Sequence, residues 1–270
     1  MESNFIGITG DVPIYRIVDL SYLLRDISQG TITLPRVMSW DDTHEATYYR
    51  SPIELGGIDT SIEDLGLEWF GQCWSLKPES DAMWRIYNAN FESVRIMALA
   101  GELFDSVLRS RVAREPSFIS CAHKNLFIGK VRYHDDPSYR ISMKKPLREF
   151  VGLDHRTAAE LLLQKRDAFE HENEVRLLYQ SISGHEGLSD RPYYSGDLTK
   201  AWEFRHHVSH VPELISLPFD WTIVKEVMIG PRTKRHVAVG IRELFGLAAP
   251  WINVEESNLY GPPPRLGNSI

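Results

Sequence analysis

The sequence is poor in cysteine and has no long apolar run. Only Cys73 and Cys121 occur among 270 residues, which indicates no disulfide framework. No stretch approaches the roughly 18 apolar residues that a membrane span needs. The N-terminus also lacks the basic and apolar regions of a signal peptide. These absences predict a soluble, cytoplasmic protein in a reducing setting that has no membrane partner.

An excess of basic residues is also missing. Lys and Arg number 30 against 37 Asp and Glu, the net charge is -7, and the basic residues are dispersed along the chain. This balance argues against long contacts with nucleic acid, although a local basic groove could hold a nucleotide or a short RNA segment. With 43% hydrophobic residues, the chain can bury a substantial core. We expect one domain over 1–260 and a loose proline-rich tail over 261–270.

Three common nucleotide and hydrolase motifs are absent as well. The sequence has no G-x-x-x-x-G-K-S/T loop, no G-x-G-x-x-G fingerprint and no G-x-S-x-G elbow. Their absence disfavours P-loop, dinucleotide-fold and α/β-hydrolase mechanisms.

Strand patterns outnumber helix patterns and do not alternate strictly with them. The predicted strands cover 14–18, 31–34, 70–75, 91–99, 126–133, 214–217, 223–229 and 251–254. Helices are predicted after the caps Asp19 and Ser80, over 102–111, from the capping box of Thr157 and Glu160, and over 237–245. Residues 181–196 are predicted to form a surface loop. This order favours a mixed α+β fold over a doubly wound sheet.

The segment 169–178 carries the strongest chemical signal. If it is extended, Glu172, Glu174 and Arg176 project from one face, because side chains alternate along a strand. Closely spaced carboxylates are where pKa values are pushed apart for chemistry. The alternative is a ladder of ion pairs on an exposed sheet face.

Two clusters could instead bind metal. His206, His207 and His210 would share one face if they were helical, although Pro212 makes a regular helix doubtful. The second cluster combines Asp and His residues for a two-metal nuclease, although acid-rich loops are more often turns and caps. Its members are Asp41, Asp42, His44, Glu45, His134, Asp135 and Asp136.

Short motifs along most of the chain resemble a bacterial domain family. They are an opening Y-R at Tyr15, a W-x-D/N-x-x-E stretch over 40–45, and C-W-S over 73–75 followed by M-W. A basic residue before F-x-x-E-x-E-x-R-L over 165–177 and E-V-x-x-G over 226–230 complete the set. The order arginine, serine, glutamate over three strand segments also resembles the Arg-Ser-Glu class of ADP-ribosyltransferases. That resemblance implies a split, curved mixed β-sheet with flanking helices and a cleft between its halves.

The resemblance also implies the roles of the acidic residues. NAD would be the substrate, and nicotinamide would leave its ribose through a transition state with oxocarbenium character. Glu174 would stabilise the developing positive charge, and Glu172 would orient or deprotonate the incoming nucleophile. Independently of the resemblance, Arg176 is expected to be structural and to pair with Glu172 or Glu174, which keeps both carboxylates ionised.

Five further residues would bind NAD according to the same resemblance. Tyr15 and Arg16 open the first motif, and Arg16 would hold the pyrophosphate or the adenosine ribose. Ser75 would hold the nicotinamide-side ribose or support Glu174. Trp84 or Tyr87 would stack on the nicotinamide ring, although their helical spacing also suits a core position.

The resemblance further implies a macromolecular acceptor, protein or RNA. A transferase that modifies its own cell's machinery needs restraint, so a toxin with an antitoxin protein, in a toxin-antitoxin or phage-defence system, is the expected setting. The other interpretations are a metal-dependent nuclease and a non-catalytic interaction module.

Overall fold

The computed structural model describes residues 4–42, 44–51, 53–55, 58–60, 63–88, 92–114, 125–142, 155–181 and 212–262. Most of the predicted loop over 181–196, the histidines around His206 and positions 263–270 of the tail lie outside these residues. Within the described part, no helix is both long enough and apolar enough to span a bilayer.

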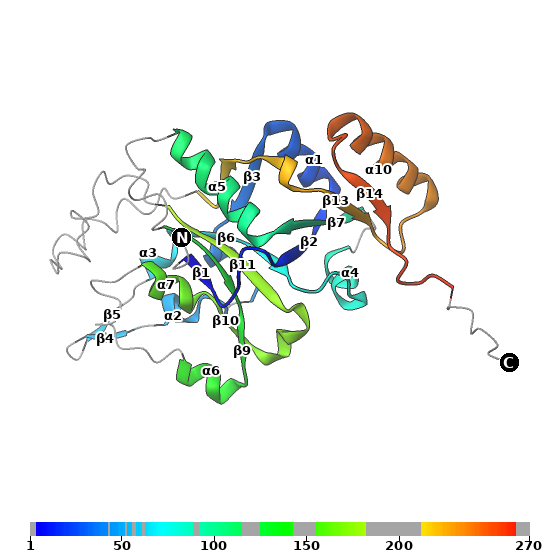
Figure 1. Ribbon diagram of the computed structural model, residues 1–270. Coiled ribbons are helices and arrows are strands. Elements are labelled where there is room, and N and C mark those ends of the chain that lie inside the picture. The colour runs from blue at the N-terminus through cyan, green and yellow to red at the C-terminus, as the bar shows by residue number, and fades with distance from the viewer. Residues whose placement is uncertain are drawn as a thin grey trace.

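An eight-stranded mixed sheet forms the centre of the molecule (Figure 1). The strand order is β1-β8-β11-β6-β2-β7-β13-β14. Both outer pairs, β1 with β8 and β13 with β14, are parallel, whereas the inner pairs are antiparallel. The strands are β1 Phe5–Ile6, β2 Pro13–Asp19, β6 Trp69–Ser75, β7 Ser93–Leu99, β8 Leu126–Lys130, β11 Glu174–Gln180, β13 Glu226–Ile229 and β14 Asn253–Glu256. The mixed α+β prediction is therefore confirmed.

The sheet is split between β2 and β6. These neighbours pair at one position, Tyr15 opposite Ser75. In contrast, β2 pairs with β7 over seven positions and β6 with β11 over seven. Two halves result, β1-β8-β11-β6 and β2-β7-β13-β14, joined in the ladder by that one pair. The predicted split of the sheet is thus present.

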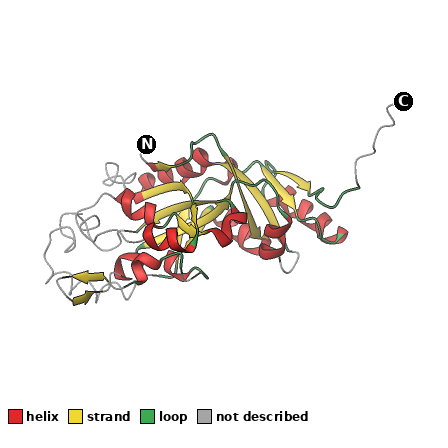
Figure 2. Ribbon diagram, turned by 90° about the horizontal axis from the view of Figure 1, so that it is seen from below, coloured by secondary structure: helices red, strands yellow, loops and turns green. Residues whose placement is uncertain are grey.

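Helices and short strands surround the sheet, with helices on both sides of it (Figure 2). The helices are α1 Leu20–Gln29, α2 Thr47–Arg50, α3 Glu63–Gly66, α4 Asp81–Tyr87, α5 Ala100–Arg114, α6 Asp136–Ser142, α7 His155–Leu161 and α10 Arg235–Ala248, with 3-10 turns η2 Val37–Ser39, η6 Asp167–Glu172 and η8 Trp221–Ile223. The remaining strands pair in twos, β3 Thr31–Pro35 with β12 Leu214–Pro218, β4 Ile53–Leu55 with β5 Ile58–Thr60, and β9 Arg132–His134 with β10 Gln164–Arg166. In Figure 1, α1, α5 and α10 lie above the sheet, and α2, α6 and α7 lie below it.

Residues at its two ends define helix α1, which follows β2 directly. The Asp19 carboxylate accepts a hydrogen bond from the Ser21 backbone N–H at 2.8 Å and so caps α1. Gly30 ends the helix in the left-handed conformation at φ 61°, which glycine adopts without steric cost. Both ends of the predicted helix are confirmed. Ser80 likewise occupies the N-cap position of α4, but its side chain makes no capping hydrogen bond.

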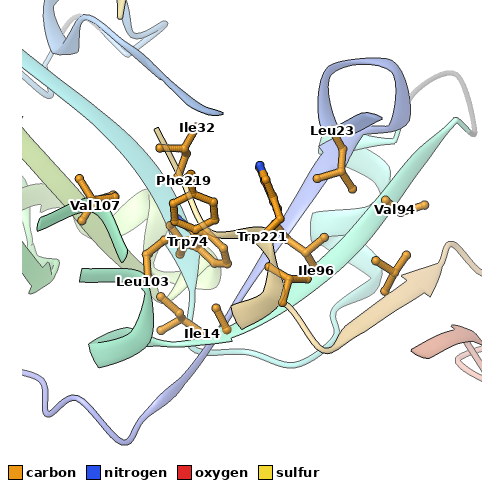
Figure 3. Packing of buried hydrophobic residues seen from close by; sticks show 14 of the residues in the cluster. Ile14, Leu23, Ile32, Trp74, Val94, Ile96, Leu103, Val107, Phe219 and Trp221 are labelled. Carbon is orange, nitrogen blue, oxygen red and sulfur yellow. The ribbon is translucent and has the colours of Figure 1, made fainter. Parts of the chain in front are cut away.

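The main core lies between the sheet and the helices above it. Leu23 of α1, Leu103 of α5 and Ile241 of α10 are each at most 2% exposed, and all belong to one buried cluster. Two aromatic rings from the segment after β12 join them. Phe219 and Trp221 pack edge to face with ring centroids 4.9 Å apart, among side chains from the strands and α5 (Figure 3).

Three predicted boundaries are wrong. The expected strand over 126–133 is two strands, because β8 pairs with β11, whereas from Arg132 onwards the chain turns to pair with β10 as β9. The expected strand over 223–229 begins only at Glu226, after the 3-10 turn η8. Helix α7 already includes His155, so Thr157 lies within it and cannot be its N-cap.

Candidate active site

The acidic segment 167–176 differs from the extended run that the sequence predicts. Residues 167–172 form the 3-10 turn η6, and Asn173 ends it in the left-handed conformation at φ 44°. Asparagine is one of the few non-glycine residues that adopt this conformation readily. Strand β11 therefore begins at Glu174, and Glu172 precedes it on a turn. The prediction of one strand face carrying Glu172, Glu174 and Arg176 is wrong for Glu172.

A lysine nevertheless brings the two carboxylates together. Lys165 of β10 donates to Oε2 of Glu172 at 2.6 Å and to Oε2 of Glu174 at 3.2 Å. Its ammonium also lies 2.7 Å from Oε1 of Glu45, which precedes α2. The lysine side chain is 5% exposed. Three separate segments thus meet at a single buried ammonium group.

Arg176 of β11 forms the second cationic centre and is completely buried. Its Nε and one terminal nitrogen donate to the two oxygens of Glu174 at 2.9 and 3.0 Å, a bidentate pairing. The other terminal nitrogen donates to the carbonyl of Leu162 at 2.6 Å, and the guanidinium also pairs with Glu45 at 3.1 Å. The predicted pairing of Arg176 with Glu174 is present, but it is buried and is not an exposed ladder.

The cluster of Glu45, Lys165, Glu172, Glu174 and Arg176, the acid cluster, carries three carboxylates and two cations. Burial disfavours the charged form of Glu174, but the Arg176 guanidinium outweighs it and lowers the pKa of Glu174 to about 2. Burial raises the pKa of Glu45, and the nearby Glu174 charge adds to that rise. Despite burial, the carboxylates raise the pKa of Lys165, which therefore stays protonated. With three carboxylates and two cations, the acid cluster has one more negative than positive group, although every carboxylate contacts a cation.

Trp40 closes the acid cluster on one side. The Arg176 guanidinium lies 4.5 Å from the centre of the Trp40 ring, within the range of a cation–π contact. Gly71 of β6 provides the space for this ring. A Cβ at position 71 would lie 2.9 Å from the carbonyl oxygen of Leu177 and 3.2 Å from Cζ2 of Trp40. The absence of a side chain at Gly71 therefore lets the indole lie close to β6.

A cavity of about 480 Å³ opens beside the acid cluster at the split of the sheet. Its walls come from β2, β6, α4, η6 and the segment 35–45. Glu45, Lys165, Glu172 and Glu174 line it, whereas Arg176 lies behind them. The cavity has the size that a small ligand or cofactor needs, and it combines apolar walls with a few charged groups.

Four of the predicted binding residues lie in this cavity. Tyr15, Arg16, Ser75 and Tyr87 all line it. Tyr15 faces Ser75 across the split, and Ser75 faces Glu174 on the next strand, so the three sit side by side on adjacent strands. The structure therefore brings together the arginine, serine and glutamate segments that the sequence singles out.

Arg16 follows the last β2–β6 pair and lies where the strands separate. Its guanidinium makes no hydrogen bond or ion pair with any residue in the described part of the chain. Burial lowers the pKa of Arg16, and the nearby Cys73, Asp26 and Tyr87 oppose that change. A guanidinium remains protonated in proteins, so the cavity contains a cation with unused donors.

Ser75 is 4% exposed, and its hydroxyl is already engaged. It donates to the carbonyl of Glu172 at 2.7 Å and accepts from the backbone N–H of Lys77 at 3.0 Å. Ser75 thus ties the end of η6 to β6 and fixes the backbone of Glu172. The contact is with Glu172 and not with Glu174, which the sequence predicts Ser75 to support, and it leaves the hydroxyl little capacity for a ligand.

Trp84 does not line the cavity, unlike its neighbour Tyr87. Its ring is 4% exposed, its indole N–H donates to Glu79 at 3.0 Å, and it lines a separate hollow with Asp81 and Tyr260. Tyr87 is 44% exposed and faces the cavity. Of the two aromatic residues proposed for stacking, only Tyr87 lines the cavity.

Two of the residues proposed for a nuclease are engaged in other contacts. Asp42 pairs with Arg166 at 3.2 Å, and His134 bonds Gln164 at 2.6 Å. Among the described residues, no group of three or more His, Cys, Asp or Glu side chains is arranged to hold a metal ion. The alternative site around His206 lies outside the described residues.

Comparisons with known proteins give remote structural likenesses. No protein-family model matches the sequence, and no curated protein matches it. The chain is similar to DarT from Thermus sp. 2.9 in complex with ADP-ribosylated ssDNA, with 11% identity, a TM-score of 0.36, and coverage of 93% of this chain and 95% of that one. It is also similar to the same protein in complex with NAD+, with 12% identity, a TM-score of 0.35, and coverage of 92% and 96%.

Proposed function

We propose that this chain is an NAD-dependent ADP-ribosyltransferase that acts on a macromolecular acceptor. The observation that carries the proposal is the cavity at the split of the sheet, with an unpaired arginine on one wall and the acid cluster on the other. A dinucleotide with anionic phosphates and a cationic nicotinamide ring needs these two kinds of charge at separate points.

The residues divide the binding of NAD between the two walls. Arg16 holds the pyrophosphate or adenosine ribose through its unused donors. Tyr15 lies beside it on β2, and its ring packs 4.9 Å from the Arg95 guanidinium, which fixes the ring in place. Tyr87 stacks on the nicotinamide ring from α4. Ser75 supports this end of the cavity through its bond to the Glu172 carbonyl.

The carboxylates act on the ribose that carries nicotinamide. Glu174, held ionised by Arg176, supplies fixed negative charge where the oxocarbenium ion develops. Glu172 orients the incoming nucleophile and accepts its proton. The site is desolvated on this side, which strengthens these electrostatic interactions relative to water.

The biological setting is part of the proposal and rests on the sequence resemblance. The acceptor is a protein or an RNA, with no preference set by the cavity alone. A cytoplasmic toxin restrained by an antitoxin protein, within a toxin-antitoxin or phage-defence system, fits an enzyme of this class.

The test measures nicotinamide release and label transfer from NAD carrying a labelled adenosine. Native protein and Arg16→Met are compared with and without a cell lysate that contains protein and RNA. We expect release and transfer by the native chain. We expect weaker NAD binding by Arg16→Met at an unchanged melting temperature, because Arg16 has no partner to lose. Chelator should change neither result. Native protein that neither binds nor cleaves NAD contradicts the proposal, and chelator-sensitive nuclease activity would favour the nuclease instead.

A further inference from the structure

The Lys165 ammonium contacts three carboxylates at once, and the proposed reaction gives this lysine no role. Its ammonium contacts Glu45 Oε1 at 2.7 Å, Glu172 Oε2 at 2.6 Å and Glu174 Oε2 at 3.2 Å. An ammonium group has three N–H donors, so each carboxylate takes one. Lys165 comes from β10, which pairs with β9 outside the main sheet, and it therefore reaches the acid cluster from a separate element.

The carboxylate oxygens of the acid cluster are not equivalent. Both oxygens of Glu174 accept from Arg176, and both oxygens of Glu45 face a cation. Glu172 differs, because its Oε2 is bound to Lys165 while its Oε1 accepts no hydrogen bond from the described residues. The Glu172 side chain is also the most exposed of the three, at 10% against 3% for Glu174 and 8% for Glu45.

We propose that Lys165 is a positioning residue of this site, which binds one oxygen of Glu172 and thereby fixes the other, Oε1, as the atom that accepts a proton in the cavity. This inference rests on the proposed function for the identity of the substrate. The arrangement of the oxygens is independent of that function. Lys165 itself touches no substrate and acts through Glu172.

Oε1 of Glu172 takes part in the exchange of bonds at C1′ of the ribose. The bond between C1′ and the nicotinamide nitrogen breaks, and its electron pair neutralises the pyridinium ring. A lone pair of the acceptor forms the new bond to C1′, and the acceptor's proton passes to Oε1 of Glu172. Water takes the place of the acceptor in hydrolysis. NAD and acceptor thus give nicotinamide, the ADP-ribosylated acceptor and one proton, which leaves Glu172 for solvent.

Because charged groups surround Lys165, its replacement should change the pH dependence of the activity. Carboxylates face it from the segment before α2, from η6 and from β11, and Arg176 is the remaining cation in the acid cluster. Three neutral groups border them, Cys73 of β6, Tyr87 of α4 and Tyr133 of β9. Without the lysine charge, three carboxylates share one guanidinium and bind protons more readily. The ionised form needed for proton acceptance is then lost at a higher pH.

The experiment compares Lys165→Met, Glu172→Gln and the double variant with native protein in nicotinamide release. We expect each single variant to lose roughly 100-fold or more in kcat with little change in KM, as for removal of a general base. The acid limb of the Lys165→Met profile should move up by about one pH unit or more. The double variant should be no slower than the slower single variant. Arg166→Met, whose partner Asp42 lies outside the acid cluster, is the matched control and should keep the native profile.

Two outcomes overturn the inference. One is a Lys165→Met activity that falls only in proportion to the folded fraction, with an unmoved pH profile. The other is a double variant in which the two losses multiply. Carbodiimide-driven amidation measures the relative reactivity of the three carboxylates and does not require NAD. Glu172 should be labelled faster than Glu45 and Glu174 in native protein, and the difference should vanish in Lys165→Met. If Glu172 is labelled faster in a chain that does not cleave NAD, the proposed function and the contact of Glu172 with substrate are refuted. If the three glutamates are labelled equally in native protein, the positioning role of Lys165 is refuted.

Discussion

Replacing Glu174 by Gln tests the energetics of the acid cluster. The change keeps the shape of the side chain but removes the charge that pairs with Arg176 and Lys165. The glutamate side chain is 3% exposed and the arginine is fully buried, so solvent screens their interaction little. Removing one partner of a buried pair costs about 3–5 kcal/mol, because the other charge is left uncompensated.

The pKa of Glu174 gives an independent magnitude. Folding lowers this pKa from 4.5 to about 2, which corresponds to roughly 3 kcal/mol of stability at neutral pH. A lowered pKa in the folded state stabilises the protein above the unfolded pKa, and the contribution is lost as the pH falls towards the folded pKa. We therefore expect Glu174→Gln to be about 3 kcal/mol less stable than native protein at pH 7, and only about 1 kcal/mol less stable at pH 3.

Urea unfolding followed by tryptophan fluorescence measures this difference at pH 7, 5, 4 and 3. At pH 7 the melting temperature should fall by about 6–12 °C for a chain of this size. Glu160→Gln is the control, because Glu160 pairs with Arg156 one helical turn away at 25% exposure and should cost less than about 1 kcal/mol. A stability difference between native and Glu174→Gln that does not change with pH would refute the electrostatic account.

Three further substitutions test the residues in and around the cavity. Gly71→Ala should lower the free energy of unfolding by about 1–3 kcal/mol in urea titrations, because its Cβ would meet the Leu177 carbonyl and the Trp40 ring. Trp84→Ala should lower it by about 3–5 kcal/mol with NAD affinity kept in the folded fraction, since the ring is buried away from the cavity. Tyr87→Ala should do the reverse in calorimetry, weakening NAD binding at a nearly unchanged melting temperature. NAD affinity lost in Trp84→Ala and kept in Tyr87→Ala would contradict the assignment of the stacking residue.

Local sequence signals predict much of the fold. The Asp19 cap, the Gly30 end of α1 and the apolar strand over 70–75 each depend on a few adjacent residues, and all are present in the structure. The boundary at Glu174 could not be found in this way. The alternation of charged and mostly apolar residues over 169–178 fits a strand. The turn η6 depends instead on contacts with distant residues, such as the hydrogen bond from Ser75 to the Glu172 carbonyl, 97 residues away in the sequence.

The acid cluster was only partly predictable for the same reason. Glu172, Glu174 and Arg176 are close in the sequence, so their spacing suggests a shared site. Lys165 and Glu45 lie within two of the short sequence motifs. From the sequence, however, Glu45 is expected in a metal cluster, and no role is expected for Lys165. Both are charged residues that are buried in the structure, and burial of a charged side chain cannot be recognised from a single sequence. Only the pairing of β9 with β10 and the fold of the segment before α2 bring them to Glu174.

The split of the sheet also orders the events of biosynthesis. The half that bears the acid cluster, β1-β8-β11-β6, is complete once residue 180 has left the ribosome, whereas the half that bears Arg16 needs β13 and β14, which end at residue 256. Translation proceeds at about 5–20 residues per second, so the chain between residues 180 and 256 takes several seconds to emerge. The acidic wall of the cavity can therefore be built several seconds before the strands that brace the arginine wall emerge. A nascent chain thus passes through a stage in which every strand of the acidic wall has been made while the arginine wall is still incomplete.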